Sequence, residues 1–314
     1  MKWKHLLKSE NGQALVFTAL LLTGLLGFTG LVIDGGKLYL AKSQLQKAVD
    51  AGALAGGDVM LKSKADSGSF NHPTANTEAM KISGNNYNGT GISYAACFRN
   101  QAETNCSGMN ATANVIQVNG REEVALVLMP ILGISSTVTV EARAEVQIGS
   151  VGTVYAGNII PIGIKKEEAQ GLEFGTIWDI SDSPGEGFQG NYSFLDFSSI
   201  HESGPNGANG VKYYIENGAQ VPISVNQQIK TENGVMTGPV NTAITAKIGE
   251  IVYVPIVSEI TSNTVTVLGF AAMKIIDYDT SSKTVKAQFL EEVLEGDIGG
   301  GSNEYGTYTS KMIL

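Results

Sequence analysis

The sequence predicts an α+β fold: a single N-terminal transmembrane helix continues into a long helix, packed on a mainly antiparallel, β-rich extracytoplasmic domain. Three observations support this. An uncharged apolar run covers residues 14–33, a stripe of apolar and small residues follows it at helical spacing, and short strand-like segments separated by Gly, Asn and Pro fill most of the remainder. A content of 38 glycines in 314 residues with only 16% charged residues is also typical of a β protein.

The apolar run from Ala14 to Ile33 is long enough to cross a membrane, because a spanning helix needs about 20 apolar residues. The basic leader, residues 1–13, precedes it and Asp34 follows it. The positive-inside rule then predicts a single-pass cell-membrane protein with a cytoplasmic N-terminus and an extracytoplasmic bulk. A secretory signal peptide is one alternative. Prepilin-type cleavage near Gly12, which would remove the leader and keep the helix, is another.

The helix is expected to continue beyond the membrane over residues 34–61. Spacings that alternate between three and four residues place one stripe on a single side of this helix, which we call the packing seam. The seam consists of Leu38, Ala41, Leu45, Ala48, Gly52, Ala55 and Val59. It could lie on the chain's own domain or pack against copies of the chain or partner pilins. The expected cover is the alternating strand face of residues 138–148.

Residues 62–113 are rich in Ser, Asn, Thr, Gly and Ala, which predicts a surface loop excursion. Cys97 and Cys106 lie within it. In an oxidising compartment these two cysteines are expected to form a disulfide, and two free thiols are the alternative.

Residues 114–314 are expected to form the β-rich extracytoplasmic domain, since strand patterns recur there at short intervals. Besides residues 138–148, with 124–129 as a proposed partner, the candidate strands are 158–164, 174–180, 191–197, 221–225, 251–257, 263–270, 284–290 and 307–313. Short helical turns are expected at 165–170, 206–217 and 241–247.

The chain offers little that predicts chemistry. Asp179, Ser181 and Ser183 match the DxSxS motif of von Willebrand factor A-like domains, which bind a divalent metal. That fold needs repeated βα units around a parallel sheet, and residues 184–314 read as strands and glycines, so we interpret the motif as a polar turn. We expect no metal, no cofactor and no enzymatic activity. A net charge of -9 without a basic cluster argues against nucleic acid as a partner.

The segment from Gly12 to Gly57 resembles the N-terminal segment of TadG-like proteins of the tight-adherence (Flp) pilus machinery. The matching features are Gly12-Gln13-Ala14, the apolar span, Asp34 with Gly35 or Gly36, Leu38-Tyr39, and the run from Leu45 to Gly56. Phe17 departs from the pattern, because processed pilins usually carry Glu five residues after the cut.

The resemblance implies a membrane-anchored, pilin-like accessory or structural protein of Flp pilus assembly or cell-envelope adhesion that acts by protein–protein contacts. Membrane lipid around residues 14–33 and other pilus or envelope proteins would be its partners, and a homo-oligomer is possible. The alternative function is a surface adhesin whose loops, 62–113 or 179–210, hold a ligand or a divalent cation.

Overall fold

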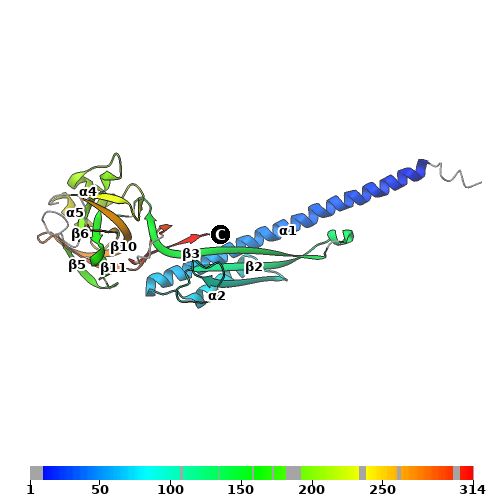
Figure 1. Ribbon diagram of the computed structural model, residues 1–314, viewed down its shortest axis with the longest axis horizontal. Helices are drawn as coiled ribbons and strands as arrows, with labels where there is room; N and C mark the ends of the chain where they lie inside the picture. The colour runs from blue at the N-terminus through cyan, green and yellow to red at the C-terminus, as the bar shows by residue number, and fades with distance from the viewer. Residues whose placement is uncertain are drawn as a thin grey trace, which may run out of the picture.

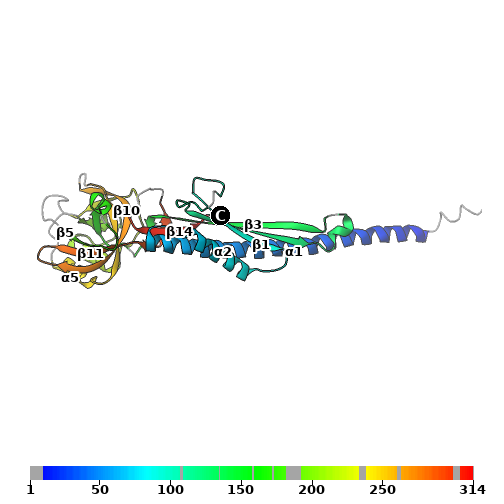
Figure 2. The ribbon, with the colours of Figure 1, turned by 90° about the horizontal axis from the view of Figure 1, so that it is seen from below.

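The computed structural model describes residues 10–106, 109–133, 135–157, 159–171, 173–181, 192–232, 238–259, 263–299 and 305–313. The fold is α+β, with one long apolar N-terminal helix and mostly antiparallel sheets, as the sequence predicts. Two parts follow one another along the molecule: an elongated stalk, in which helices lie along a sheet, and a rounder lobe (Figures 1 and 2). The N-terminal part of the long helix projects from the stalk at the end away from the lobe.

Helix α1 runs from Glu10 to Ser67 as a single 58-residue helix. At 1.5 Å per residue it is about 87 Å long, far more than a bilayer core requires. Its N-terminal part is long and apolar enough to span a membrane. The large apolar side chains between Leu15 and Ile33 are 46–74% exposed within the protein, as expected of a lipid-facing segment. Beyond Asp34, one side of α1 is buried by the stalk.

The stalk sheet has the strand order β1-β2-β3-β14-β12, and β13 and β7 also pair with β3. These strands are β1 (Ile92–Arg99), β2 (Val115–Ala125), β3 (Thr137–Val154), β7 (Ile223–Ser224), β12 (Glu292–Val293), β13 (Gly296–Ile298) and β14 (Thr307–Met312). All pairings are antiparallel except β12 with β14. Along β3, the even-numbered residues from Ala142 to Ile148 are buried in the same core cluster as Leu45 of α1.

The structure corrects the predicted surface excursion at 62–113. That segment contains α2 (His72–Asn86), which packs on α1, and β1, which pairs with β2 along its whole length. The side chain of Asn71 caps α2 by accepting a hydrogen bond from the backbone N–H of Thr74. The buried side of α2 consists of His72, Ala75, Ala79 and Ser83, so it lacks the large apolar residues that mark a helix in a sequence.

The lobe is a second sheet with the order β5-β11-β10-β8-β6-β4-β9, in which β9 also pairs with β10. Five strands therefore close into a small barrel, and β11 and β5 extend from it. The strands are β4 (Ile162–Lys165), β5 (Ile177–Ser181), β6 (Tyr192–Asp196), β8 (Gln228–Thr231), β9 (Ile251–Val257), β10 (Thr264–Asp279) and β11 (Thr284–Leu290). The lobe helices are α3 (Lys166–Gln170), α4 (Gly207–Asn217) and α5 (Pro239–Ala246).

The lobe is an insertion in the stalk sheet, because the chain leaves the stalk after β3, builds the barrel and returns to pair β14 with β3. The two parts share a core cluster in which Val151 and Val154 of β3 pack with barrel residues such as Phe270. The C-terminal strand β14 consequently lies in the part of the stalk nearer the lobe (Figure 1). The proposed strand at 124–129 is displaced, since β2 ends at Ala125 and the chain then turns.

Candidate functional site

The candidate site is the part of α1 that follows the candidate membrane span and enters the stalk. Leu45 is fully buried and faces β2 at Gly120. A Cβ added to Gly120 would lie 2.9 Å from Cδ1 of Leu45 and 2.8 Å from Cγ1 of Val49. The missing side chain at Gly120 thus lets the helix lie directly on the sheet.

Beside this contact, on the same side of the helix, α1 packs against α2 through glycine. A Cβ added to Gly52 would lie 2.0 Å from Oγ of Ser83 and 2.7 Å from the backbone oxygen of Ala79. At Gly56 the added atom would meet Cδ1 of Ile116 at 2.4 Å and Cβ of Ala79 at 3.0 Å. Small residues at helical spacing allow such close approach of two backbones. Helix α1 therefore packs against both α2 and the stalk sheet along one side, and Gly56 contacts both of them.

The first part of the packing seam is buried, whereas its second part turns away from the buried side of α1. Ala41, Leu45, Ala48 and Gly52 are buried and Leu38 is half-buried. The last two members, Ala55 and Val59, are only partly buried, while Gly56 and Met60, one position further on, are fully covered. A strict 3.5-residue repeat drifts by about 20° per heptad on a straight helix of 3.6 residues per turn. The buried residues of α1 therefore follow the helical period of 3.6 residues rather than the 3.5-residue repeat of the seam.

At the edge of the contact between α1 and the sheet, polar side chains of α1 donate hydrogen bonds to backbone carbonyls of the hairpin β2–β3. Lys37 Nζ donates to the carbonyl of Ala125 at 2.8 Å, and Gln46 Nε2 donates to that of Arg143 at 2.8 Å. Lys42 Nζ donates to the carbonyl of Glu141. These three bonds follow successive turns of α1 and fix its register along the sheet.

Asp34 connects the end of the span to the tip of the same hairpin. Its side chain is fully buried. Oδ1 accepts a hydrogen bond from the N–H of Val127 at 2.9 Å, and Oδ2 accepts from those of Leu128 at 2.9 Å and Met129 at 2.7 Å. Burial alone would raise the pKa of Asp34, but these three donors, with the nearby charge of Lys37, hold it below its usual value. The charged carboxylate thus links α1 to the hairpin through hydrogen bonds. From the sequence alone, the position of Asp34 indicates only the end of the span.

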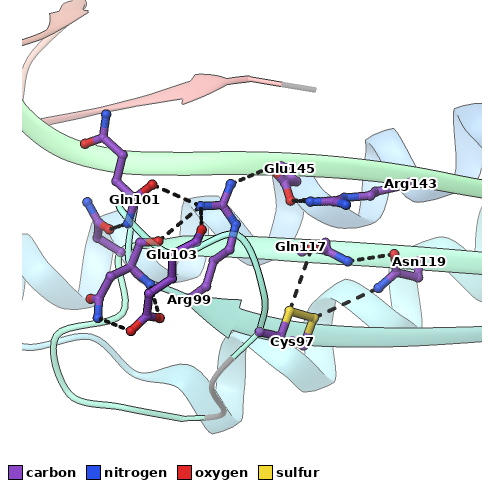
Figure 3. Close-up of polar contacts among 11 residues, drawn as sticks. Cys97, Arg99, Gln101, Glu103, Gln117, Asn119, Arg143 and Glu145 are labelled. Atoms are coloured by element: carbon purple, nitrogen blue, oxygen red, sulfur yellow. Dashed lines mark hydrogen bonds and ion pairs between the residues drawn. A yellow bond between two sulfur atoms is a disulfide. The ribbon is translucent and has the colours of Figure 1, made fainter.

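A buried ion pair lies on the face of the stalk sheet opposite α1 (Figure 3). Glu145, whose side chain is 3% exposed, accepts a hydrogen bond from Arg99 at 2.7 Å and pairs with Arg143. Arg99 also donates to three backbone carbonyls of the loop after β1, among them that of Glu103 at 2.7 Å. The structure joins Cys97 and Cys106 by a disulfide in the same region, with Cα atoms 5.8 Å apart. Together these contacts fix the loop after β1 to the sheet.

The lobe contributes no comparable cluster among its described residues. Asp179 lies in β5, which pairs antiparallel with β11 and therefore differs from the parallel strand of a von Willebrand factor A-like domain. Ser183 lies outside the described residues, and the side chain of Ser181 is not described. Within the described part of the chain, no three His, Cys, Asp or Glu side chains are grouped to hold a metal ion.

Comparison with known families identifies the segment that forms this contact. Residues 12–59 match the Tad family model, described as "Putative Flp pilus-assembly TadE/G-like". We call residues 12–59 the Tad segment after the family model that they match. The match confirms the resemblance read from Gly12 to Gly57 and points to the Flp pilus-assembly family. No curated protein and no solved structure matches the chain.

The Tad segment comprises the candidate span and nearly all of the packed part of α1. Asp34, Gly52 and Gly56 all belong to it, and each contacts residues that lie beyond it in the chain. The hairpin tip, α2 and β2 therefore form the surface on which the Tad segment packs within the same chain.

Proposed function

We propose that this protein is a membrane-anchored accessory or structural component of Flp pilus assembly, which acts by protein–protein contacts and catalyses no reaction. The observation that carries the proposal is the Tad segment, because the same helix is both the candidate membrane span and the central helix of the stalk. In this proposal the N-terminus is cytoplasmic, and stalk and lobe stand outside the membrane.

The stalk would serve as a stiff connection between membrane and lobe. Helix α1 is continuous from span to stalk, where α2 and the sheet together cover one side of it. Strand β3 continues from the stalk into the core shared with the barrel. The lobe is consequently held at a defined distance from the membrane, where it can meet other envelope proteins.

Partner contacts are best sought on the outer side of α1 beyond the span. Leu40 is 56% exposed and Leu54 is 51% exposed. They lie about four helical turns apart on one side of α1, away from the packed side. Both leucines are available for contact with a helix of another pilus protein or of a second copy of the chain.

The adhesin alternative has lost part of its basis. One of the two loops expected to hold a ligand, 62–113, is largely folded into α2 and β1. Of the other, 179–210, residues 182–191 lie outside the described residues.

The test is genetic and structural. Deletion of the gene in its host should abolish or strongly reduce surface pili counted by electron microscopy, and the wild-type gene should restore them. A photo-crosslinking residue at Leu54 should capture a pilus protein or a second copy of the chain, whereas one at exposed Ile248 of the lobe serves as a matched position off the helix. Normal piliation of the deletion strain would refute the proposal.

Orientation is tested separately. Protease added to intact protoplasts should digest the stalk and lobe, because both are proposed to lie outside. Full protection of both parts, with digestion only after lysis, would reverse the proposed topology and leave the pilus role to the genetic test.

A further inference from the structure

The tip of the β2–β3 hairpin lies at the level of the membrane span. In both views the tip lies beside α1 at the end of the stalk away from the lobe (Figures 1 and 2). Gly30 of the span is buried there, and a Cβ added to it would lie 2.9 Å from Cβ of Leu128. Gly30 precedes the end of the apolar run at Ile33 by about 5 Å along the helix axis. The hairpin therefore overlaps the last turn of the span rather than ending above it.

The sequence of the tip is apolar. From Val124 to Ile134 it reads VALVLMPILGI and contains no charged or polar side chain. Val127 is 59% exposed, so the tip presents apolar surface that the protein itself does not cover. A soluble turn at the end of a long hairpin is normally built from Gly, Asn, Asp and Ser.

The backbone of the tip is also hydrogen-bonded to an extent that a turn in water does not require. Asp34 accepts from the N–H groups of three successive residues, 127–129. The N–H of Leu126 donates to Ser136, that of Gly133 donates to Pro130, and Pro130 itself has no N–H. Irregular backbone is excluded from the hydrocarbon region unless its polar groups have partners within the protein. Here one buried carboxylate meets that condition for three donors at once.

We propose that the hairpin tip, residues 126–133, inserts into the outer edge of the lipid bilayer beside α1 and forms a second membrane contact. The occupant of its exposed apolar surface is lipid, because the tip continues the apolar surface of the span and touches it at Gly30. Asp34 then lies at the membrane boundary without exposing its charge to lipid. Two attachments, helix and hairpin, fix the tilt of the stalk relative to the membrane, which a single helix leaves free.

Tryptophan quenching in bilayers tests this insertion. The full chain is reconstituted into vesicles of phosphatidylcholine with bromines at defined acyl positions, in a background where Trp3 and Trp178 are replaced by Phe. Bromines near the headgroup end should quench Val127→Trp about twofold or more, as expected for an interfacial segment buried by about 5–10 Å. The matched control is Thr139→Trp, an exposed position further along β3, which should not be quenched.

Leu22→Trp, at a position 57% exposed in the middle of the span, reports on the helix itself. Quenching of Leu22→Trp by bromines near the bilayer centre, with Val127→Trp no more quenched than Thr139→Trp, would overturn the hairpin insertion and leave the anchor intact. Absence of quenching at Leu22→Trp and Val127→Trp would overturn both. Neither result depends on the pilus role, which the deletion strain tests.

Discussion

The substitution Gly52→Leu probes the contact between α1 and α2 most directly. A Cβ at this position already meets the backbone oxygen of Ala79 at 2.7 Å, and a backbone atom cannot rotate away as Oγ of Ser83 can. Helix α2 must therefore shift. Overpacking of a tight core costs about 1–3 kcal/mol, and replacing Gly in a helix returns about 1 kcal/mol at most. Leucine adds three further carbons, so we expect a net loss of about 2 kcal/mol.

The measurement is thermal unfolding of the full chain in bilayer nanodiscs, followed by circular dichroism. A loss of about 2 kcal/mol corresponds to a decrease in Tm of roughly 4–8 °C for a domain of this size. Gly84→Leu is the matched control, since Gly84 lies in α2 and an added Cβ has nothing within 4 Å. It should melt at or slightly above the wild-type temperature. Equal Tm values for Gly52→Leu and Gly84→Leu would refute the close packing of α1 on α2.

Three further outcomes are expected from other contacts of the stalk. Leu45→Asp should lower the free energy of unfolding in denaturant titration by about 3 kcal/mol or more, because it buries an unpaired carboxylate. The control Leu54→Asp makes the same change at a side chain that is 51% exposed, so it should be nearly neutral. Equal losses of stability in the two variants would contradict the burial of the packing seam. Mass spectrometry of unreduced protein should show one linked peptide containing Cys97 and Cys106, and reduction should cost about 2–3 kcal/mol, whereas two alkylatable thiols would exclude the bond. Burial alone would raise the pKa of Glu145, but hydrogen bonds from Arg99 and Arg143 outweigh that effect, so the pKa in the folded protein is lowered. The ionised carboxylate therefore stabilises the fold fully above its unfolded-state pKa of about 4.3, and this stabilisation is lost as the pH falls through the lower folded-state pKa. Glu145→Gln should remove this part of the acid sensitivity, and an unchanged pH profile would show that the ion pair does not cause it.

Periodicity predicted the regular elements with large side chains well. The strands at 251–257 and 284–290 have the expected bounds, and the helical turn expected at 206–217 is α4. In these segments the apolar residues repeat at the period of the element, so local pattern and buried face coincide. Strand β3 shows both the success and the limit: its even-numbered face is buried as expected, but Glu145 on the other face is buried as well because Arg99 pairs with it.

Contacts made by small or polar residues were not visible in the pattern. Helix α2 buries Ala75, Ala79 and Ser83, which give no apolar stripe, although Asn71 followed by Pro73 is a helix-start signal. For Asp34 the sequence indicates only the end of the span, because nothing in the local sequence indicates that residues 127–129 donate to it. Contacts between segments so far apart in the chain depend on the assembled fold.

The return of the chain to the stalk at β14 has a consequence for the order in which the molecule can be completed. The Tad segment and β1–β3 are synthesised first, yet the edge of β3 from Val146 to Ser150 has no strand partner until Thr307–Met312 has been made. Tyr308, 3% exposed in the stalk core, arrives only then. A chain that ends prematurely in the lobe would carry an open strand edge and an unfilled core in the stalk, and such edges promote aggregation and proteolysis. Closure of the stalk therefore depends on the strand that is made last. A molecule truncated in the lobe would be defective in the stalk, in strands that were synthesised long before the chain stopped.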